Sequence, residues 1–475
     1  MNAMLERLFH LSEHGTTVRR EVTAGLITFL TMAYIIFVQP AVLSGVLFGE
    51  KMLTGMNFGA VMVATCLSAA LFSCIMGLFA RYPIALAPGM GENFFFVFSA
   101  IPAVAAAGFA EPWRVALGMV FWSGLVFLVI SLAGIRESLF DAVSNNMKHA
   151  ISVGIGLFVA FIGMQNAGLI LKDPGTAVKL NHAFESPDLI VFFVGLIVAS
   201  ACLARGLRGG ILLGMAAATV VAVALKLGLP HLLPNAWSSK IVQDSLLVRQ
   251  FKIATHVISS PPSLAPTFLK LDIVGALTPH LAPLIFIFLY MAVFDTMGTL
   301  IGIGELAGLM RDGKLVRAQR AFATDAASSL VGSLLGTSTV TAYIESGAGI
   351  LYGGRTGLTA VTTGLLFLLA PFFTPVVEMV GSYPPITACA LVLVGVMMIQ
   401  NVNRITWDDP TEAIPAFLVI LGIPLSYSIS DGLAIGFISY PIIKALSGRL
   451  RDVRWLMWVL SILLLAYFVF VRSHL

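Results

Sequence analysis

The sequence predicts an all-α polytopic membrane protein, and three observations support this class. Of the 475 residues, 58% are hydrophobic and only 11% are charged, whereas a soluble domain has about 25% charged residues. The mean hydropathy is +0.95 over the whole chain, and a soluble protein of this size would need far more polar surface. Apolar stretches of about 20 residues, the length of a membrane-spanning helix, recur along the chain.

The apolar stretches form two sets of seven, separated by a more polar stretch at 230–280. In chain order they lie near 22–46, 57–79, 84–107, 113–134, 149–170, 188–204 and 209–229, and then near 281–309, 320–336, 338–352, 357–380, 385–401, 412–427 and 431–447. A last apolar piece at 455–471 makes the prediction fourteen transmembrane segments or fifteen apolar pieces. Seven spans per half orient the two halves oppositely, which predicts a seven-plus-seven inverted repeat. The fifth spans, GIGLFVAFIGMQNAGLI and ALVLVGVMMIQNVNRI, are also similar to each other.

The distribution of basic residues predicts the orientation. Residues 1–21 have no long apolar run and are expected to form a cytoplasmic amphipathic N-terminus rather than a cleaved signal. With this end inside, the basic clusters at 205–208, 311–320 and 444–454 all face the cytoplasm, as the positive-inside rule requires. The stretch 230–280 is then an extracellular loop. We expect a multi-pass protein of a cell (inner) membrane.

The third span of each half is broken. The first reads PIALAPGMGENFFFVF (83–98), in which prolines and glycines oppose a continuous helix. The second reads TSTVTAYIESGAGI (337–350), in which the threonines favour extended backbone. Each is predicted to be a short strand that leads into a half-helix. Such backbone survives at membrane depth only inside protein or beside a watery cavity, and two breaks at matching positions indicate a transport site.

The predicted half-helices begin at polar residues. The first begins near Glu92 or Asn93, and the second near Glu345 or Ser346. Their N-terminal N–H groups and positive dipole ends would face the site and stabilise an anion there. Glu345 is therefore a candidate ligand-binding carboxylate.

A second acid, Asp295, lies in the middle of the eighth span. An ionised acid at this depth costs at least ~2.5–3.5 kcal/mol on insertion scales, so such residues are functional by default. We expect Asp295 and Glu345 to bind substrate and one of them to carry a proton. The alternative is that each acid is satisfied by a neighbouring threonine or backbone N–H and serves only helix packing.

Several neutral or acidic neighbours complete the candidate site. The amide of Asn93 offers donors and an acceptor suited to the edge of a heterocycle, although asparagine is equally an ordinary helix N-cap. Glu92 would point away from the same target and is interpreted as a cap or ion-pair partner. Phe94 and Tyr343 could stack on a flat ligand, although most of the 33 phenylalanines must face lipid or core.

Other features narrow the class of protein. Thr299, one turn after Asp295, and Ser346 are further candidate modulators of the site, as is Glu92. The sequence has no P-loop, HExxH, GxSxG or spaced Cys/His set. We therefore expect a protein that is not an enzyme and has no cofactor or metal site. We expect an ion gradient to be its source of energy. The net charge of +4 gives no reason to expect a nucleic-acid partner.

Four motifs carry a resemblance to a known family. They are ALAPGMGENFFFVF, FDTMGTLIG, GTSTVTAYIESGAGI with GGRTGLTAV, and WDDPTEAIPAFL with SISDGLAIGFISYPIIK. Together they resemble the azaguanine-like branch (adenine, guanine and hypoxanthine permeases) of the nucleobase–cation symporter-2 family. The resemblance runs from about residue 5 to the final apolar piece.

The resemblance implies both an architecture and an activity. It implies a core domain of spans 1–4 (22–134) and 8–11 (281–380), and a gate domain of spans 5–7 (149–229) and 12–14 (385–475). It also implies proton-coupled uptake of purine bases, namely adenine, hypoxanthine, guanine and sometimes xanthine.

Residue by residue, the family's site acids correspond to Asp295 and Glu345, and its third-span asparagine to Asn93. This chain departs from the pattern at Glu92, where relatives usually have an apolar residue, and this puts the purine preference in doubt. The alternative cargo is another small solute, such as uracil, urate or an anion. The oligomeric state is open, with a homodimer among the alternatives.

Overall fold

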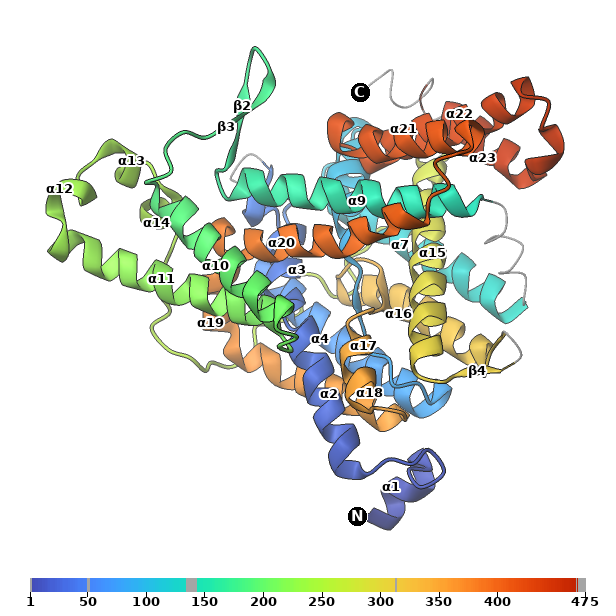
Figure 1. The fold of residues 1–475 in the computed structure, drawn as a ribbon, viewed down its shortest axis with the longest axis horizontal. Coiled ribbons are helices and arrows are strands. Elements are labelled where there is room, and N and C mark those ends of the chain that lie inside the picture. Colours follow the sequence, from blue (N-terminus) through green and yellow to red (C-terminus); the bar gives the residue numbers. More distant parts are fainter. Residues whose placement is uncertain (1, 49–51, 134–142, 312–313, 467, 469–475) are drawn as a thin grey trace.

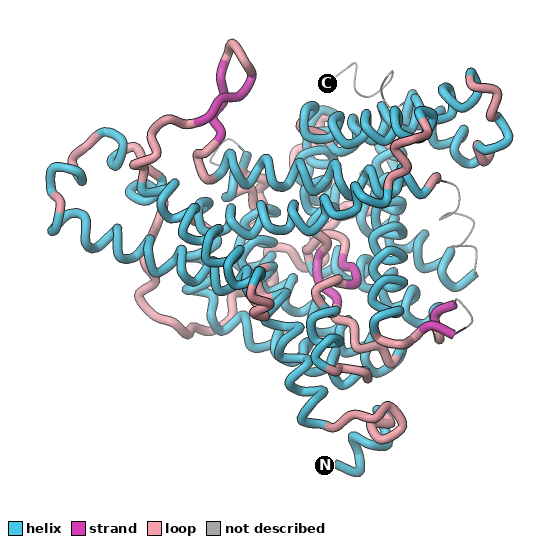
Figure 2. Tube along the Cα trace, in the orientation of Figure 1, coloured by secondary structure: helices cyan, strands magenta, loops and turns pink. Residues whose placement is uncertain are grey.

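The computed structural model describes residues 2–48, 52–133, 143–311, 314–466 and 468. Within these residues, ten helices are long and apolar enough to cross a membrane, and two shorter apolar helical stretches run over Met90–Ala106 and Pro410–Ser426. Figure 2 shows a chain that is almost entirely helical, with short strands only. The prediction of a mostly helical multi-pass membrane protein is confirmed.

The helices follow the predicted spans closely. In the first half they are α1 (Asn2–Phe9), α2 (Val18–Met32), α3 (Ile35–Leu43), α4 (Phe58–Ile75), α5 (Met90–Phe95), α6 (Ile101–Ala106), α7 (Pro112–Ala133), α9 (Asn145–Asn166), α10 (Pro187–Ala204) and α11 (Gly210–Leu232). In the second half they are α15 (Ala282–Leu306), α16 (Ala318–Leu335), α17 (Ser346–Tyr352), α18 (Gly357–Leu369), α19 (Thr374–Gly381), α20 (Pro384–Ile399), α21 (Pro410–Ser426), α22 (Ile429–Leu446) and α23 (Trp455–Ala466).

Two local details differ from the sequence predictions. The first half-helix begins at Met90, not near Glu92, because extended Gly89 acts as its N-cap and Gly91 is accommodated in the first turn. The first span is interrupted between α2 and α3. The last apolar piece, predicted at 455–471, is described as α23 up to Ala466 and packs against α22. Residues 467 and 469–471 of that piece lie outside the described residues.

The polar stretch between the halves contains three short helices. They are α12 (Pro234–Trp237), α13 (Lys240–Gln243) and α14 (Leu246–Arg249). The carboxylate of Asp188, at the start of α10, accepts the N–H groups of Leu246 over 2.8 Å and Leu247 over 3.0 Å. It also accepts the hydroxyl of Tyr383 over 2.6 Å. These bonds hold the stretch against α10 and α20.

The helices pack as two groups. The first helix group comprises α2, α3, α4, α7, α15, α16, α17 and α18, and the second helix group comprises α9, α10, α11, α20, α21 and α22. In Figure 1, α9, α20 and α10 run alongside one another, and α2, α4, α17 and α18 lie together below them. The half-helix α5 contacts α3 and α15 of the first group and α9 and α22 of the second. It therefore lies at the junction of the two groups.

Glycines let the helices approach closely within each group. A Cβ atom added to Gly77 would lie 2.3 Å from the carbonyl oxygen of Gly357, so α18 packs directly on the backbone that follows α4. In the second group, a Cβ on Gly395 would lie 2.5 Å from the carbonyl oxygen of Gly156. In a bilayer the hydrophobic effect does not drive helices together, because lipid tails are as apolar as the helices. Small residues at helix crossings allow close approach, and the resulting van der Waals contacts stabilise the packing.

The two broken spans meet in a two-stranded antiparallel sheet. Strand β1 (Leu86–Pro88) pairs with β6 (Val340–Ala342), with Ala87 opposite Thr341. The ladder continues on both sides, because the N–H of Gly89 donates to Thr339 over 2.9 Å and that of Tyr343 donates to Ala85 over 3.0 Å. The predicted strands are therefore confirmed. Their pairing satisfies backbone groups that would otherwise be stranded in an apolar interior, and Figure 2 shows this pair near the middle of the molecule.

The remaining strands form two hairpins away from this centre. Strands β2 (Ile170–Asp173) and β3 (Ala177–Leu180) connect α9 to α10, and β4 (Met310–Arg311) and β5 (Lys314–Leu315) connect α15 to α16.

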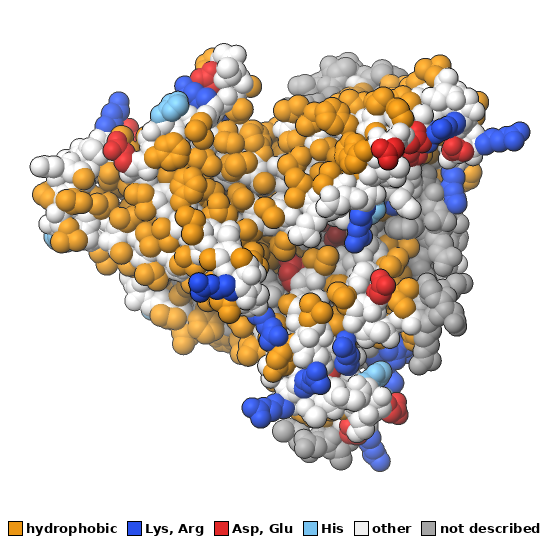
Figure 3. Space-filling view, in the orientation of Figure 1, with side chains coloured by type: hydrophobic (Ala, Val, Ile, Leu, Met, Phe, Trp, Pro, Cys, Tyr) orange, Lys and Arg blue, Asp and Glu red, His pale blue; other side chains and the backbone are white. Residues whose placement is uncertain are grey.

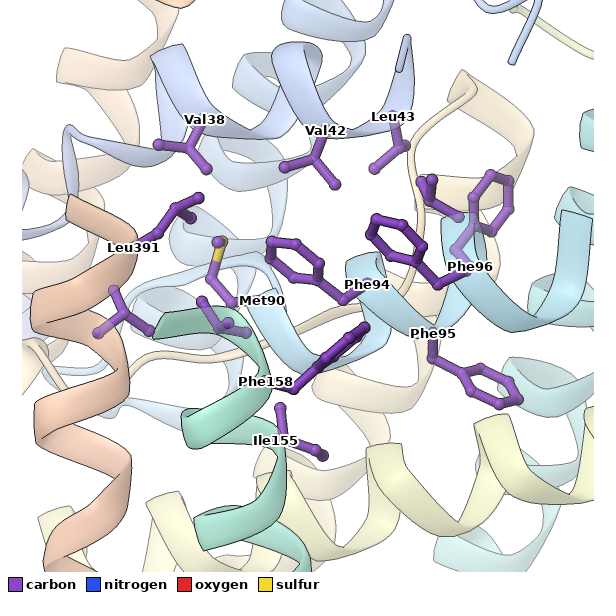
Figure 4. Packing of buried hydrophobic residues seen from close by; sticks show 14 of the residues in the cluster. Val38, Val42, Leu43, Met90, Phe94, Phe95, Phe96, Ile155, Phe158 and Leu391 are labelled. Carbon is purple, nitrogen blue, oxygen red and sulfur yellow. The ribbon is translucent and has the colours of Figure 1, made fainter. Parts of the chain in front are cut away.

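An apolar cluster packs α5 between the two groups. Phe94 of α5 lies between Val42 of α3 and Phe158 of α9, with Met90 beside it (Figure 4). The Phe94 ring makes an edge contact with Phe158 at a centroid distance of 6.2 Å. The half-helix is thus held by contacts to both groups rather than by its own short length.

Candidate functional site

The carboxyl groups that the fold brings together surround the paired strands. They come from the two half-helix starts, from the middle of α15 and from the middle of α16, and they belong to Glu92, Glu345, Asp295 and Asp325. Three of the four were noted in the sequence, and Asp325 was not. Half-helix N-termini at the strand pair present backbone N–H groups to the same region.

Glu345 immediately precedes α17 and is half-buried. The hydroxyl of Tyr34, at the break between α2 and α3, donates to its Oε1 over 2.9 Å. The hydroxyl of Thr31 lies 3.3 Å from its main-chain carbonyl oxygen, to which it donates. The interruption in the first span therefore orients the carboxylate of the tenth span.

Asp295 is exposed, although it lies in the middle of an apolar helix. The Thr341 side chain of β6 faces its carboxyl group. Along the same stripe of α15, a Cβ added to Gly298 or Gly302 would meet no atom within 4 Å, so open space runs along the helix from Asp295. Figure 3 shows acidic side chains in a recess near the middle of the molecule. Asp295 therefore borders an open crevice rather than a packed core.

Asp325 of α16 is the acid that sequence reasoning missed. It is fully buried, and its Oδ1 accepts the N–H of Ala342 in β6 over 2.7 Å. The hydroxyl of Thr296 in α15 donates to its other oxygen and lies 3.2 Å from the hydroxyl of Thr341. The carboxylate thus joins α15, α16 and β6. The available signal was a single acid within a predicted membrane span, here among alanines and serines. The same kind of signal, a single acid within a span, identified Asp295.

The amide of Asn93 lies in a buried polar network. Gln39 of α3 exchanges hydrogen bonds with it, one of them over 3.0 Å from Gln39 Nε2 to Asn93 Oδ1. Gln39 also donates to the hydroxyl of Thr337 over 3.0 Å, and the hydroxyl of Ser338 donates to Asn93. A ligand contact by Asn93 remains a prediction, since the amide is engaged by protein groups here. Sequence reasoning missed Gln39, a lone amide in an apolar span.

Glu92 is buried at 2% exposure in the first turn of α5. Its Oε1 has no hydrogen-bond partner among the described residues, and the acidic groups that act on it electrostatically are Asp295 and Asp325. The expected ion pair is not found within the described part of the chain. The carboxyl group instead folds back toward Gly89, consistent with the alternative of a helix cap.

The other predicted site residues lie around the strand pair. The hydroxyl of Tyr343 donates to the carbonyl oxygen of Pro88 over 2.5 Å, and the hydroxyl of Ser346 accepts the N–H of Ala85 over 3.1 Å. Thr299 is buried one turn beyond Asp295, and Phe94 packs in the aromatic cluster of α5. Tyr343 and Ser346 thus position the two broken spans, and their contact with a ligand stays a prediction.

Together these features define a class of protein. Two half-helices that meet at buried strands, with carboxyl groups at membrane depth and open space beside one of them, are the arrangement found at the site of secondary transporters. The chain is a polytopic membrane transporter by fold and by site.

The comparison with known proteins gives the family. The model of the permease family matches residues 19–435, and the chain belongs to this family. The chain is 39% identical over 472 residues to the adenine permease AdeP of Escherichia coli, covering 99% of this chain and 97% of that one. It is 39% identical over 473 residues to the guanine/hypoxanthine permease PbuG of Bacillus subtilis, covering 98% and 100%. The resemblance read from the four motifs is therefore confirmed.

Solved structures show the same fold at low sequence identity. The transmembrane domain of a cyanobacterial bicarbonate transporter, BicA, superposes with a TM-score of 0.60 at 12% identity and covers 88% of this chain and 96% of its own. The anion transporter SLC26A9 gives a TM-score of 0.61 at 11% identity and covers 94% and 69%. At such identities the likeness concerns the fold alone.

Proposed function

We propose that this permease is a proton-coupled importer of purine nucleobases of the adenine, hypoxanthine and guanine class. The observation that carries the proposal is the carboxylate of Glu345, held by Tyr34 over 2.9 Å at the start of a half-helix. Permeases named for adenine and for guanine and hypoxanthine are related to this chain over nearly its full length, which supports a purine as cargo.

The chemistry of a purine matches the groups at the strand pair. A purine has N–H donors along one edge and ring-nitrogen acceptors along another. A carboxylate at Glu345 accepts from the N–H edge, and backbone N–H groups at the half-helix starts donate to the ring nitrogens. The Asn93 amide, which is hydrogen-bonded to Gln39, can bind a purine edge that carries both donors and acceptors. To do so it exchanges one of its protein hydrogen-bond partners for the ligand.

Asp295 is the proposed carrier of the coupling proton. It borders open space on α15, so water reaches it from the crevice. Protonation of Asp295 removes a negative charge from a region that already contains Glu92, Asp325 and Glu345, and this favours the substrate-bound state. Release of the proton on the other side weakens binding, and this difference in affinity couples the gradient to the cargo.

The two helix groups are proposed to be the moving parts. The first helix group corresponds to a core domain (22–134 and 281–380) and the second to a gate domain (149–229 and 385–475). Two broken spans that pair antiparallel near the middle of the molecule support a seven-plus-seven inverted repeat. The two groups meet through α5, through the contact of α2 with α11 and through α19, and we propose that the core moves against the gate at these contacts.

The orientation follows from the basic residues. We propose an inner-membrane protein with the N-terminus in the cytoplasm. The open stripe of α15 runs from Asp295 through Gly298 and Gly302 toward the hairpin of β4 and β5. Leu309 and Val316, the residues that flank this hairpin, and the N-terminal segment border a common cavity, so the hairpin and the N-terminal segment lie at the same end of the molecule. The structure therefore fits an inward-open state.

Uptake measurements test the proposal. Radiolabelled adenine, hypoxanthine and guanine are offered separately to cells that lack their own purine carriers, with and without a protonophore. We expect saturable uptake of at least one base that is lost with the protonophore and in Glu345→Gln. The matched control is Glu305→Gln, an exposed acid near the end of α15 that should retain uptake. Absence of uptake of every purine, with the protein present in the membrane, would contradict the cargo.

A further inference from the structure

A second cavity lies away from the strand pair, at the end of the molecule that carries the N-terminus. Its volume is about 330 Å³, which lies in the range of small-molecule pockets, roughly 300–1,000 Å³. Its polar lining includes His10 and His14 from the N-terminal segment, Arg81 from the turn after α4 and Arg317 from the turn before α16. Figure 3 shows Lys and Arg side chains gathered at this end of the molecule. The transport site uses none of these residues.

Three of these basic residues have an unusual backbone. His10, Arg81 and Arg317 have φ angles of 52°, 58° and 61°, in the left-handed region, and they account for three of the six described non-glycine residues with positive φ. This conformation costs roughly 1–2 kcal/mol for a residue other than glycine. Glycine would avoid that cost at each position, yet the chain has a basic side chain at all three. Strain concentrated around one cavity indicates a function for those side chains.

The charges of the lining favour an anion. Arg81 is exposed and forms no ion pair among the described residues. Arg317 Nη2 lies 3.4 Å from the Arg81 carbonyl oxygen, to which it donates, and this contact sets the two turns side by side. The acid in the lining, Glu13, has one carboxylate oxygen 3.3 Å from His10 Nδ1. Among the lining residues that the structure describes, there are thus two guanidinium groups, which stay charged at any physiological pH, and one carboxylate.

We propose that this cavity binds a phosphate-type oxoanion through Arg81 and Arg317, and that the bound anion fastens the N-terminal segment to the end of the first helix group. A guanidinium group presents N–H donors in a fork that matches two phosphate oxygens. The phosphate comes either from a soluble phosphate or phosphoester or from the headgroup of an anionic lipid, which share this chemistry. The inference is independent of the transported cargo.

Thermal unfolding of the purified full-length protein tests the site. In a non-ionic detergent, the midpoint of unfolding is followed while inorganic phosphate replaces chloride at constant ionic strength. We expect a saturable rise for the unaltered protein, with the apparent affinity weakened on the order of tenfold in Arg81→Gln and in Arg317→Gln. Arg19→Gln, an exposed arginine of α2 outside the cavity, is the matched control and should respond like the unaltered protein.

A lipid arm separates the two sources of phosphate. The same four proteins are placed in nanodiscs of a neutral lipid, with and without phosphatidylglycerol, and the N-terminal segment is probed by limited proteolysis. Protection that needs phosphatidylglycerol, Arg81 and Arg317 would identify a lipid headgroup, and protection by phosphate in neutral nanodiscs would identify a soluble anion. Equal responses in all four proteins, or none in either arm, would overturn the proposal. Because Arg317 also contacts a backbone carbonyl, Arg81→Gln decides the matter if Arg317→Gln does not fold.

Discussion

The hydroxyl of Tyr34 donates to Oε1 of Glu345 over 2.9 Å and so joins the break in the first span to the start of the half-helix α17. The two residues belong to spans in opposite halves of the sequence. A carboxylate that is held in one rotamer presents its second oxygen in a fixed direction, and pre-organisation of this kind raises affinity by reducing the entropy lost on binding.

The first prediction concerns this hydrogen bond. Tyr34→Phe removes the hydroxyl, and we expect the KM for purine uptake to rise on the order of tenfold, because a hydrogen bond to a charged group contributes about 1.5–3 kcal/mol. Initial uptake rates over a range of substrate concentrations measure the effect. The matched control is Tyr290→Phe, because the buried hydroxyl of Tyr290 has no hydrogen-bond partner among the described residues. An unchanged KM in Tyr34→Phe would show that the bond does not orient Glu345 for binding.

The second prediction concerns Asp325. In Asp325→Asn one oxygen becomes an NH2 group, which donates but does not accept, so the side chain can no longer accept the Ala342 N–H and the Thr296 hydroxyl on two separate oxygens. The loss of one accepted bond at a buried site should cost about 1–3 kcal/mol of stability and should loosen β6 beside the site. We expect a lower midpoint of thermal unfolding and uptake reduced at least several-fold. Uptake at the level of the unaltered protein would mean that β6 keeps its position without this carboxylate.

The third prediction concerns Glu92, a buried carboxyl group with one unpartnered oxygen beside two other acids. Burial of an unpaired charge is costly, so replacement by the uncharged isostere should not destabilise the fold. We expect Glu92→Gln to unfold at the same temperature as the unaltered protein or at a higher one. The dependence of uptake on pH, measured alongside, reports whether Glu92 takes part in proton coupling. A clear loss of thermal stability would show that a charged Glu92 is stabilised by its surroundings.

The fourth prediction concerns the open stripe of α15. Gly302→Leu places a bulky side chain where a Cβ has no neighbour within 4 Å, so it should leave folding intact while it narrows the crevice that leads from Asp295. We expect normal abundance in the membrane and uptake that falls at least several-fold. Gly228→Leu is the matched control, because a Cβ on this helical glycine of α11 would meet only the Leu232 side chain, at an ordinary contact distance of 3.6 Å, and because α11 belongs to the second helix group. Equal uptake in both variants would exclude this crevice as the release path.

Much of the fold could be predicted because the signals are local. The length of an apolar stretch determines whether a helix can cross the bilayer, and the bounds of α4, α7, α10 and α20 fall within a few residues of the predicted spans. The breaks were equally visible, because prolines, glycines and threonines act on the backbone of their own segment. The start of α5 was placed late because glycines at a helix start resemble a helix breaker.

The candidate site was predicted in part. Asp295 and Glu345 stood out because an acid in an apolar helix is costly wherever the helix lies. Gln39 and Asp325 carry the same signal in weaker form, and the structure shows that they hold Asn93 and β6 in place. Their importance depends on partners that are distant in sequence, so no local pattern gives it.

By itself, the sequence determined that this protein is a multi-pass membrane protein, where its spans lie and which two of them are broken, because hydropathy and backbone preference are properties of single segments. Only the tertiary structure decided that β1 pairs with β6, that Tyr34 holds Glu345, and that α15 borders open space beside Asp295. Each of these relations joins residues from separate spans, and they follow from how the helices pack around the broken segments to satisfy their backbone groups.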